Sequence, residues 1–72
     1  MLLFVKMLRG KNLHLDVEEN DTIATLKVKI EDKEGIPPAR QLLLYACQPL
    51  LDAATLEDYN IREEAILHLI VQ

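Results

Sequence analysis

The sequence predicts an α+β domain: a mixed sheet of four to five strands with one central helix packed across it. Three observations predict this class. Apolar and polar residues alternate in residues 11–17, apolar residues recur at helical spacing after residue 22, and short strand-like segments return between residues 41 and 72. Two strands, a helix and then several strands is an α+β order. Because no linker or repeat interrupts the 72 residues, we expect residues 1–72 to form a single domain.

The clearest strand pattern lies in residues 11–17, where Leu13, Leu15 and Val17 alternate with polar residues. Such alternation is typical of a strand with one buried face. Gly10 precedes this strand and can adopt the positive φ that a bulged hairpin loop requires. A tight turn is therefore predicted there.

Residues 1–7 form the preceding strand, and both of its faces are largely apolar. Lys6 marks one face as solvent-exposed, and Leu2 and Phe4 share that face because alternate residues of a strand point the same way. Two large apolar side chains therefore lie outside the predicted core. The core face carries Leu3, Val5 and Met7.

A helix is predicted between a capping pair and two prolines. Asp21 and Thr22 can accept hydrogen bonds from the first free backbone N–H groups. Gly35 suits the position just past the last turn, and Pro37 and Pro38 forbid continuation. The spacing assigns Ile23, Leu26 and Ile30 to the core side and Lys27, Lys29, Glu31, Asp32 and Lys33 to the solvent side.

The second half of the chain predicts shorter elements. We expect a strand over residues 41–45, a short strand starting at Pro49, a helical turn over residues 56–59 and a closing strand over residues 66–72. The closing strand again has two apolar faces. One parity, assigned to the core, holds Leu67, Leu69 and Val71, and the other holds Ile66, His68 and Ile70.

Composition and charge exclude several functional classes. The chain carries 8 basic and 12 acidic residues without a basic stripe, so nucleic acid is not an expected partner. The apolar runs are too short to span a bilayer and no signal-peptide pattern is present, so no membrane partner is expected. One cysteine cannot form an internal disulfide. A reducing compartment, the cytoplasm or the nucleus, is therefore the expected location.

Six blocks of the sequence resemble the ubiquitin family at matching positions, without a gap over the 72 residues and with roughly half of the positions identical. The resemblance implies the β-grasp fold, in which a first hairpin and a central helix precede a C-terminal strand that pairs parallel to the first strand. The blocks are Phe4-Val5-Lys6, Gly10-Lys11, Asp21-Thr22-Ile23, Asp32-Lys33-Glu34-Gly35-Ile36-Pro37-Pro38, Asp58-Tyr59-Asn60-Ile61 and Leu67-His68-Leu69.

The resemblance also implies a use for the apolar residues outside the core. In the ubiquitin family, a shallow apolar patch on the first hairpin tip and two strands docks receptors. The implied partners are ubiquitin-binding or ubiquitin-pathway proteins, including the proteasome. The matching positions, with two neighbours, form what we call the main patch: Leu8, Leu42, Leu44, Cys47, His68 and Ile70.

Two further surfaces are implied by the family pattern. One centres on Phe4, with Leu2 and Ile66 beside it, and the other groups Ile36 with Leu8 and Val71. Exposed apolar clusters of this kind mark interaction sites. A homodimer through these surfaces or the main patch is an alternative to a foreign partner.

The family's conjugating members end in a flexible tail that closes with Gly-Gly and is joined to a lysine. The sequence reaches Gln72 without such a tail, and Gln72 is neutral where ubiquitin has an arginine read by its activating enzyme. We therefore expect a non-catalytic binding module. The alternatives are a covalent modifier whose tail is missing after Gln72, and an engineered ubiquitin variant.

Five lysines match positions that ubiquitin uses to build chains, and the two most used positions hold Gln48 and Glu63 instead. The resemblance implies a structural role for Lys27, which tends in this fold to be partly buried and paired with an acid near Asp52. The five candidate acceptor lysines are Lys6, Lys11, Lys27, Lys29 and Lys33.

No catalytic site, cofactor or metal is expected. Nucleophilic catalysis needs a thiol and a base in hydrogen-bond reach with a third orienting group. The turn that holds Cys47 is exposed in the implied fold and offers no cleft with His68. His14 and His68 lie on different strands, and structural zinc takes four ligands. We therefore expect that the protein is not an enzyme.

Overall fold

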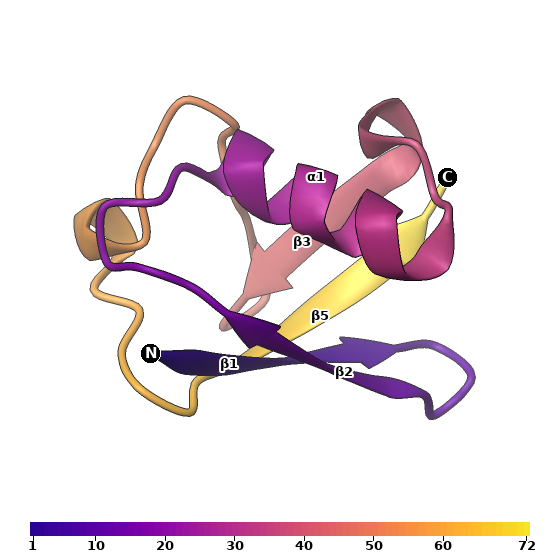
Figure 1. The fold of residues 1–72 in the computed structure, drawn as a ribbon, viewed down its shortest axis with the longest axis horizontal. Coiled ribbons are helices and arrows are strands. Elements are labelled where there is room, and N and C mark those ends of the chain that lie inside the picture. The colour runs from indigo at the N-terminus through magenta and orange to yellow at the C-terminus, as the bar shows by residue number, and fades with distance from the viewer.

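The computed structural model describes all 72 residues and contains a five-stranded mixed sheet with one helix across one face (Figure 1). This confirms the predicted fold class. The strand order is β2-β1-β5-β3-β4. The elements are β1 (Leu2–Met7), β2 (Asn12–Asp16), α1 (Ile23–Glu34), the 3-10 turn η1 (Pro38–Arg40), β3 (Gln41–Tyr45), β4 (Gln48–Pro49), the 3-10 turn η2 (Glu57–Tyr59) and β5 (Ile66–Val71).

The centre of the sheet is a parallel pair formed by β1 and β5, the first and last strands of the chain. All other pairs are antiparallel: β1 with β2, β5 with β3, and β3 with β4. Parallel strands cannot be joined by a tight turn. The helix and the long connections between β1 and β5 supply the crossover, as Figure 1 shows.

The first hairpin forms as its glycine predicted. Gly10 has a φ of 83°, and its backbone N–H donates to the carbonyl oxygen of Met7 over 3.0 Å. The backbone N–H of Met7 in turn donates to the carbonyl of Lys11 over 2.8 Å. Positive φ is a conformation that glycine adopts without steric cost. The chain therefore reverses tightly and leaves Leu8 at the tip.

Both predicted ends of α1 are confirmed. The Oγ1 of Thr22 accepts a hydrogen bond from the backbone N–H of Thr25 over 3.2 Å. Gly35 follows the last turn in the left-handed region, with φ 73°, and its N–H donates to the carbonyl of Glu31 over 2.7 Å. These contacts satisfy backbone groups that a helix end otherwise leaves free.

The core lies between α1 and the inner face of the sheet. Ile23, Leu26 and Ile30 of the helix are completely buried, as the helical spacing predicted. The strands contribute buried residues of a single parity each, such as Leu3 and Val5 in β1. The rest of the core comprises Leu13, Leu15, Val17, Leu43, Leu50, Leu56, Ile61, Leu67 and Leu69.

The helical spacing placed Lys27 on the solvent side, and this was wrong. Its exposed fraction is 8%, and its Nζ forms an ion pair with the Oδ1 of Asp52 at 2.6 Å. Lys27 lies one turn from both Ile23 and Ile30, so its aliphatic stem packs at the core margin while the charge reaches outward. The partly buried pair that the family resemblance implied is confirmed.

Three other details differ from the sequence prediction. Strand parity grouped Val71 with the core residues, but Val71 is 43% exposed at the end of β5, as the third implied surface requires. The short strand β4 begins at Gln48 instead of Pro49, and the turn η1 was not predicted.

The single α-helix has 12 residues, and no helix is long and apolar enough to cross a membrane.

Candidate docking surface

The outer face of the sheet brings most of the predicted main patch together. Leu44 of β3 is the direct cross-strand partner of His68 in β5, and Leu42 is the partner of Ile70. Their side chains share one face because each strand buries the opposite parity. Leu42 and Leu44 are half-buried, whereas His68 and Ile70 are exposed. Two adjacent strands therefore present a contiguous apolar area to solvent.

Leu8 extends this area from the hairpin tip. Its side chain is 92% exposed, which is the highest value among the large apolar residues. A groove of about 340 Å³ connects it to β5, with Ile70 and Val71 on its apolar wall. Arg9 and Lys11 flank the same groove and supply positive charge. The groove can accept an apolar side chain beside a negatively charged group.

Cys47, the remaining member of the main patch, lies in the loop between β3 and β4. This loop is a two-residue turn in which both Ala46 and Cys47 have positive φ, 51° and 65°. Type I′ hairpin turns have this geometry and favour Asn-Gly. The thiol of Cys47 is exposed and makes no hydrogen bond with His68.

The predicted surface around Phe4 gains a member that the sequence analysis missed. Phe4 of β1 pairs with His14 of β2 on one side and with Ile66 of β5 on the other. The rings of Phe4 and His14 meet edge to face, with centroids 5.0 Å apart and planes at 86°. In the alternating segment 11–17, His14 occupies a position on the solvent face of the strand. That position could have indicated that His14 lies on the same face as Phe4. Leu2 is half-buried two residues before Phe4.

The two apolar areas belong to one face of the sheet. Lys6 of β1 is the direct partner of His68, so it lies between the row of Phe4 and Ile66 and the row of Ile70 and Leu42. Its side chain is exposed and makes no ion pair. The middle row of the outer face therefore runs from Lys6 through His68 to Leu44, with apolar rows on both sides.

The structure does not bring together all three residues of the third predicted surface, Ile36, Leu8 and Val71. Leu8 and Val71 line one groove, but Ile36 does not contribute to its wall. Ile36 is partly buried and packs against the core instead.

The five candidate acceptor lysines have different environments. Lys6 and Lys33 are exposed and unpaired, and Lys11 forms a 2.9 Å ion pair with Glu34 while remaining 59% exposed at its side chain. Lys27 is itself almost fully buried and is held in its ion pair with Asp52, whose side chain is 63% exposed. Lys6, Lys11 and Lys33 are therefore the amines most open to a modifying reagent.

Lys29 forms a small network with the loop before α1. Its Nζ donates to the carbonyl of Asp16 over 2.8 Å and to the Oδ2 of Asp21 over 3.2 Å. The same carboxylate accepts a hydrogen bond from the backbone N–H of Glu18 over 2.9 Å. The N–H of Glu18, followed by Lys29, holds the pKa of Asp21 below its ordinary value, although desolvation acts in the opposite direction.

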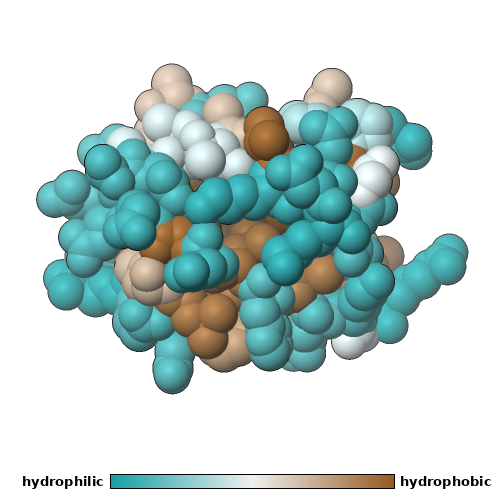
Figure 2. Space-filling model, viewed as in Figure 1, coloured by the Kyte–Doolittle hydropathy of each residue, from teal (hydrophilic) through white to brown (hydrophobic).

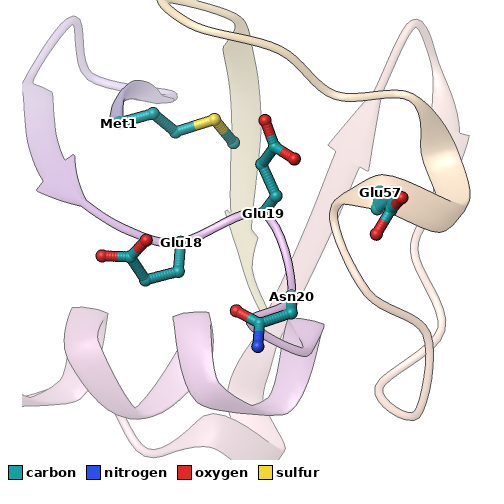
Figure 3. Close-up of a pocket in the computed structure, with 5 residues that line it drawn as sticks. All are labelled: Met1, Glu18, Glu19, Asn20 and Glu57. Carbon is teal, nitrogen blue, oxygen red and sulfur yellow. The ribbon is translucent and has the colours of Figure 1, made fainter.

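An acidic hollow of about 360 Å³ lies at the opposite end of β1 from Leu8, lined by Met1, Glu18, Glu19, Asn20 and Glu57 (Figure 3). Figure 3 shows that the carboxylates of Glu18 and Glu19 point in different directions. No group of three or more His, Cys, Asp or Glu side chains is arranged to hold a metal ion. Met1 is the one apolar residue in its lining, so the hollow offers little apolar area for docking.

Comparisons with known proteins agree with this geometry. Residues 3–72 match the model of the Ubiquitin family. Ubiquitin-like protein 1 of Schizosaccharomyces pombe is 41% identical over 71 residues, which cover 99% of this chain and 91% of that protein. NEDD8-like protein RUB3 of Arabidopsis thaliana is 40% identical over 67 residues, covering 93% of this chain and 86% of that protein.

A second kind of relative is longer than this chain. Ubiquitin-like protein 4A of Esox lucius is 40% identical over 72 residues, which cover the whole chain but only 47% of that protein. The same sequence pattern therefore occurs both in short proteins and as one part of a larger protein. The chain belongs to the ubiquitin family.

Proposed function

We propose that this chain is a non-catalytic binding module that docks ubiquitin-pathway proteins, including ubiquitin receptors and the proteasome, through the main patch. The observation that carries the proposal is the contiguous apolar area formed by Leu42 and Leu44 against Ile70 and His68, with exposed Leu8 at its edge. Exposed apolar clusters of this kind mark interaction sites.

The absence of a catalytic role is part of the proposal. Members of the ubiquitin family are generally small, non-enzymatic proteins. The exposed thiol of Cys47 has no hydrogen-bonded base, so nothing activates it as a nucleophile. A single free cysteine is compatible with the reducing environment of the cytoplasm or nucleus, where we place the protein.

A covalent modifier is the second candidate function. The chain covers 91% of the short Ubiquitin-like protein 1, whereas it covers 47% of Ubiquitin-like protein 4A. The high coverage of Ubiquitin-like protein 1 favours a small stand-alone protein. The partial coverage of Ubiquitin-like protein 4A favours a module of a longer protein. The residues encoded after Gln72 distinguish them, because an Arg-Gly-Gly end supports the modifier and a further domain contradicts it.

Alanine substitution tests the docking surface. We expect Leu44→Ala to weaken binding to an isolated ubiquitin-receptor domain by about 1 to 3 kcal/mol, because a central apolar anchor carries much of the energy of an interface. Leu8→Ala should also weaken binding, and its side chain is too exposed to affect the fold. Isothermal titration calorimetry measures both effects.

Leu51→Ala is the matched control. Leu51 is 70% exposed and lies outside the main patch, so this variant loses the same side-chain atoms without touching the proposed surface. Thermal unfolding of each variant separates lost binding from lost stability. Unchanged affinity in both Leu8→Ala and Leu44→Ala would place the docking surface elsewhere.

A further inference from the structure

The strand β2 is an open edge of the sheet, since its only partner is β1. The hydrogen bonds of the hairpin alternate along the pair. Met1 and Val17 exchange two backbone bonds, of 2.6 and 2.8 Å, and Met7 donates to Lys11 at the other end. In an antiparallel pair every second residue makes these bonds. The intervening residues of β2 therefore direct their N–H and C=O groups away from β1, and these are Asn12, His14 and Asp16.

These outward groups are almost all unpaired. The carbonyl of Asp16 accepts a hydrogen bond from Lys29, and neither Asn12 nor His14 has a backbone partner on the open side. A hollow of about 440 Å³ lies against the strand, between Leu15 and Asp16 on one side and the Lys29 and Lys33 side chains of α1 on the other. Figure 2 shows apolar atoms at the surface between α1 and the hairpin. An added strand would find both space and hydrogen-bonding groups there.

We propose that β2 pairs with β2 of a second copy of this chain, antiparallel about a two-fold axis at His14. Each copy contributes the five strands of its sheet, so the product is one continuous sheet of ten strands. The register places Asn12 opposite Asp16 of the second copy, and His14 opposite its own counterpart. Each of the three residue pairs exchanges two backbone hydrogen bonds, as antiparallel pairing allows.

The side chains of β2 are complementary to themselves in this register. The amide of Asn12 can donate to the carboxylate of Asp16 in the second copy, and the symmetric pair repeats the contact. The pairs of Asn12 with Asp16 place no like charges opposite each other, which would destabilise a cross-strand pair, and the two His14 side chains face each other at the axis. The wall contributed by α1 mixes Lys29 and Lys33 with Asp32, so it does not favour a strongly acidic or basic peptide. A second copy of the chain carries the same mixture of positive and negative side chains, so its charge suits this wall.

The dimer would leave the proposed docking surface free. Most of the main patch lies on β5 and β3, which are separated from β2 by β1. Leu8 lies at the tip of the hairpin, outside the paired residues 12–16. The row formed by Ile66, Phe4 and His14 would continue into the second copy. Two copies of the main patch would then be carried by one sheet, and a partner with two receptor modules would bind with increased avidity. The dimer does not depend on the identity of that partner.

Sedimentation equilibrium over a range of concentrations tests the proposal. The average mass of the wild-type chain should rise from 8.2 kDa toward twice that value. We expect Asn12→Asp to weaken dimerisation by about ten-fold, because two Asp pairs would face each other. Asn12→Lys should strengthen dimerisation, since each lysine would face Asp16. The side chain of Asn12 is exposed but lies opposite Lys6 of β1, so thermal unfolding of each variant checks that the fold is kept.

Amide exchange identifies the surface that is used. In the wild-type dimer, the backbone N–H groups of Asn12, His14 and Asp16 should exchange more slowly as the concentration rises. Ile66→Ser is the control, because it removes apolar area from the outer face without changing β2. A strict monomer at millimolar concentration would overturn the proposal. A dimer lost in Ile66→Ser but unchanged in both Asn12 variants would also overturn it, since that dimer would use the outer face.

Discussion

Asp21 connects three parts of the chain through a few short contacts. Its carboxylate accepts hydrogen bonds from the backbone N–H of Glu18 and from Lys29. Its own carbonyl accepts from the backbone N–H of Leu56 over 3.1 Å. The loop between β2 and α1 is thereby attached to the helix and to the segment before η2. The ionised carboxylate is the form that these donors favour, which is why the pKa of Asp21 is lowered.

The lowered pKa of Asp21 predicts part of the acid sensitivity of the fold. A carboxyl whose pKa is lower in the folded state adds stability that is fully present above the unfolded pKa of about 3.9. That contribution is lost as the pH falls through the lower folded pKa. In Asp21→Asn the free energy of unfolding should therefore fall less steeply below pH 4 than in the wild type. Urea unfolding at several acidic pH values measures the difference, and parallel curves would show that Asp21 does not contribute.

Lys27 illustrates which residue environments a sequence pattern cannot identify. Because Lys27 is charged and lies outside the stripe of apolar residues, the helical pattern placed its side chain in solvent. In the structure only 8% of the residue is exposed, because its stem packs beside the core and its charge meets Asp52. Asp52 comes from a loop 25 residues away in sequence. Only the family resemblance, which carries long-range information, indicated the pair.

At the scale of elements, the turn between β3 and β4 has unfavourable backbone chemistry. Ala46 and Cys47 both have positive φ, although each has a Cβ atom. This conformation costs a residue other than glycine about 1 to 2 kcal/mol relative to a right-handed one. The turn persists because Leu44 pairs with Pro49 and Tyr45 pairs with Gln48 on its two sides.

Replacing Cys47 with glycine should therefore stabilise the protein. We expect the free energy of unfolding to rise by about 0.5 to 1 kcal/mol in Cys47→Gly, since relief of the strain exceeds the added entropy of the unfolded chain. Chemical denaturation under reducing conditions measures it. Cys47→Ser is the matched control and should be close to neutral, because serine keeps the Cβ. Equal stability of the glycine and serine variants would contradict the strain argument.

Elements with local end signals were predicted well from the sequence. Thr22 and Gly35 mark the ends of α1 by side-chain capping and by a left-handed residue, both of which depend on neighbouring residues alone. The short strand β4 was misplaced by one residue because its start depends on the turn at Ala46 and Cys47. Neither residue is a typical turn former. Nothing local distinguishes that turn from a longer loop.

At the scale of the whole molecule, the parallel pairing of β1 with β5 decides where the apolar residues outside the core meet. It places Ile66 beside Phe4 and His68 beside Lys6. Strand parity alone predicted that such residues face outward, and the resemblance implied where they lie in the sheet. The edge-to-face contact of Phe4 with His14 was not predicted, because it depends on the register of the first hairpin.

The charges around the main patch come from segments that are far apart in the sequence and that the fold brings together. The resemblance to ubiquitin matches Leu42, Gln48 and Gln72 to positions that carry positive residues there, so it implies that three cations are missing from this rim. Gln72 is held at the end of β5, since its N–H donates to the carbonyl of Arg40 and its carbonyl accepts from Arg40 Nε over 2.7 Å. The remaining positive groups near the groove are Arg9 and Lys11, and Lys11 is paired with Glu34.

The depleted rim predicts weak salt dependence of docking. Exposed rim charges act mostly on the association rate, and salt screens them over a Debye length of about 8 to 10 Å. Affinity for an acidic ubiquitin-receptor domain should therefore fall less with added salt for this chain than for ubiquitin, as titrations at several ionic strengths would measure. The double variant Gln48→Lys with Gln72→Arg restores two charges at exposed positions and should steepen the dependence, mainly through faster association. If the wild-type chain and ubiquitin showed the same slope, the three neutral positions would not set the electrostatics of docking.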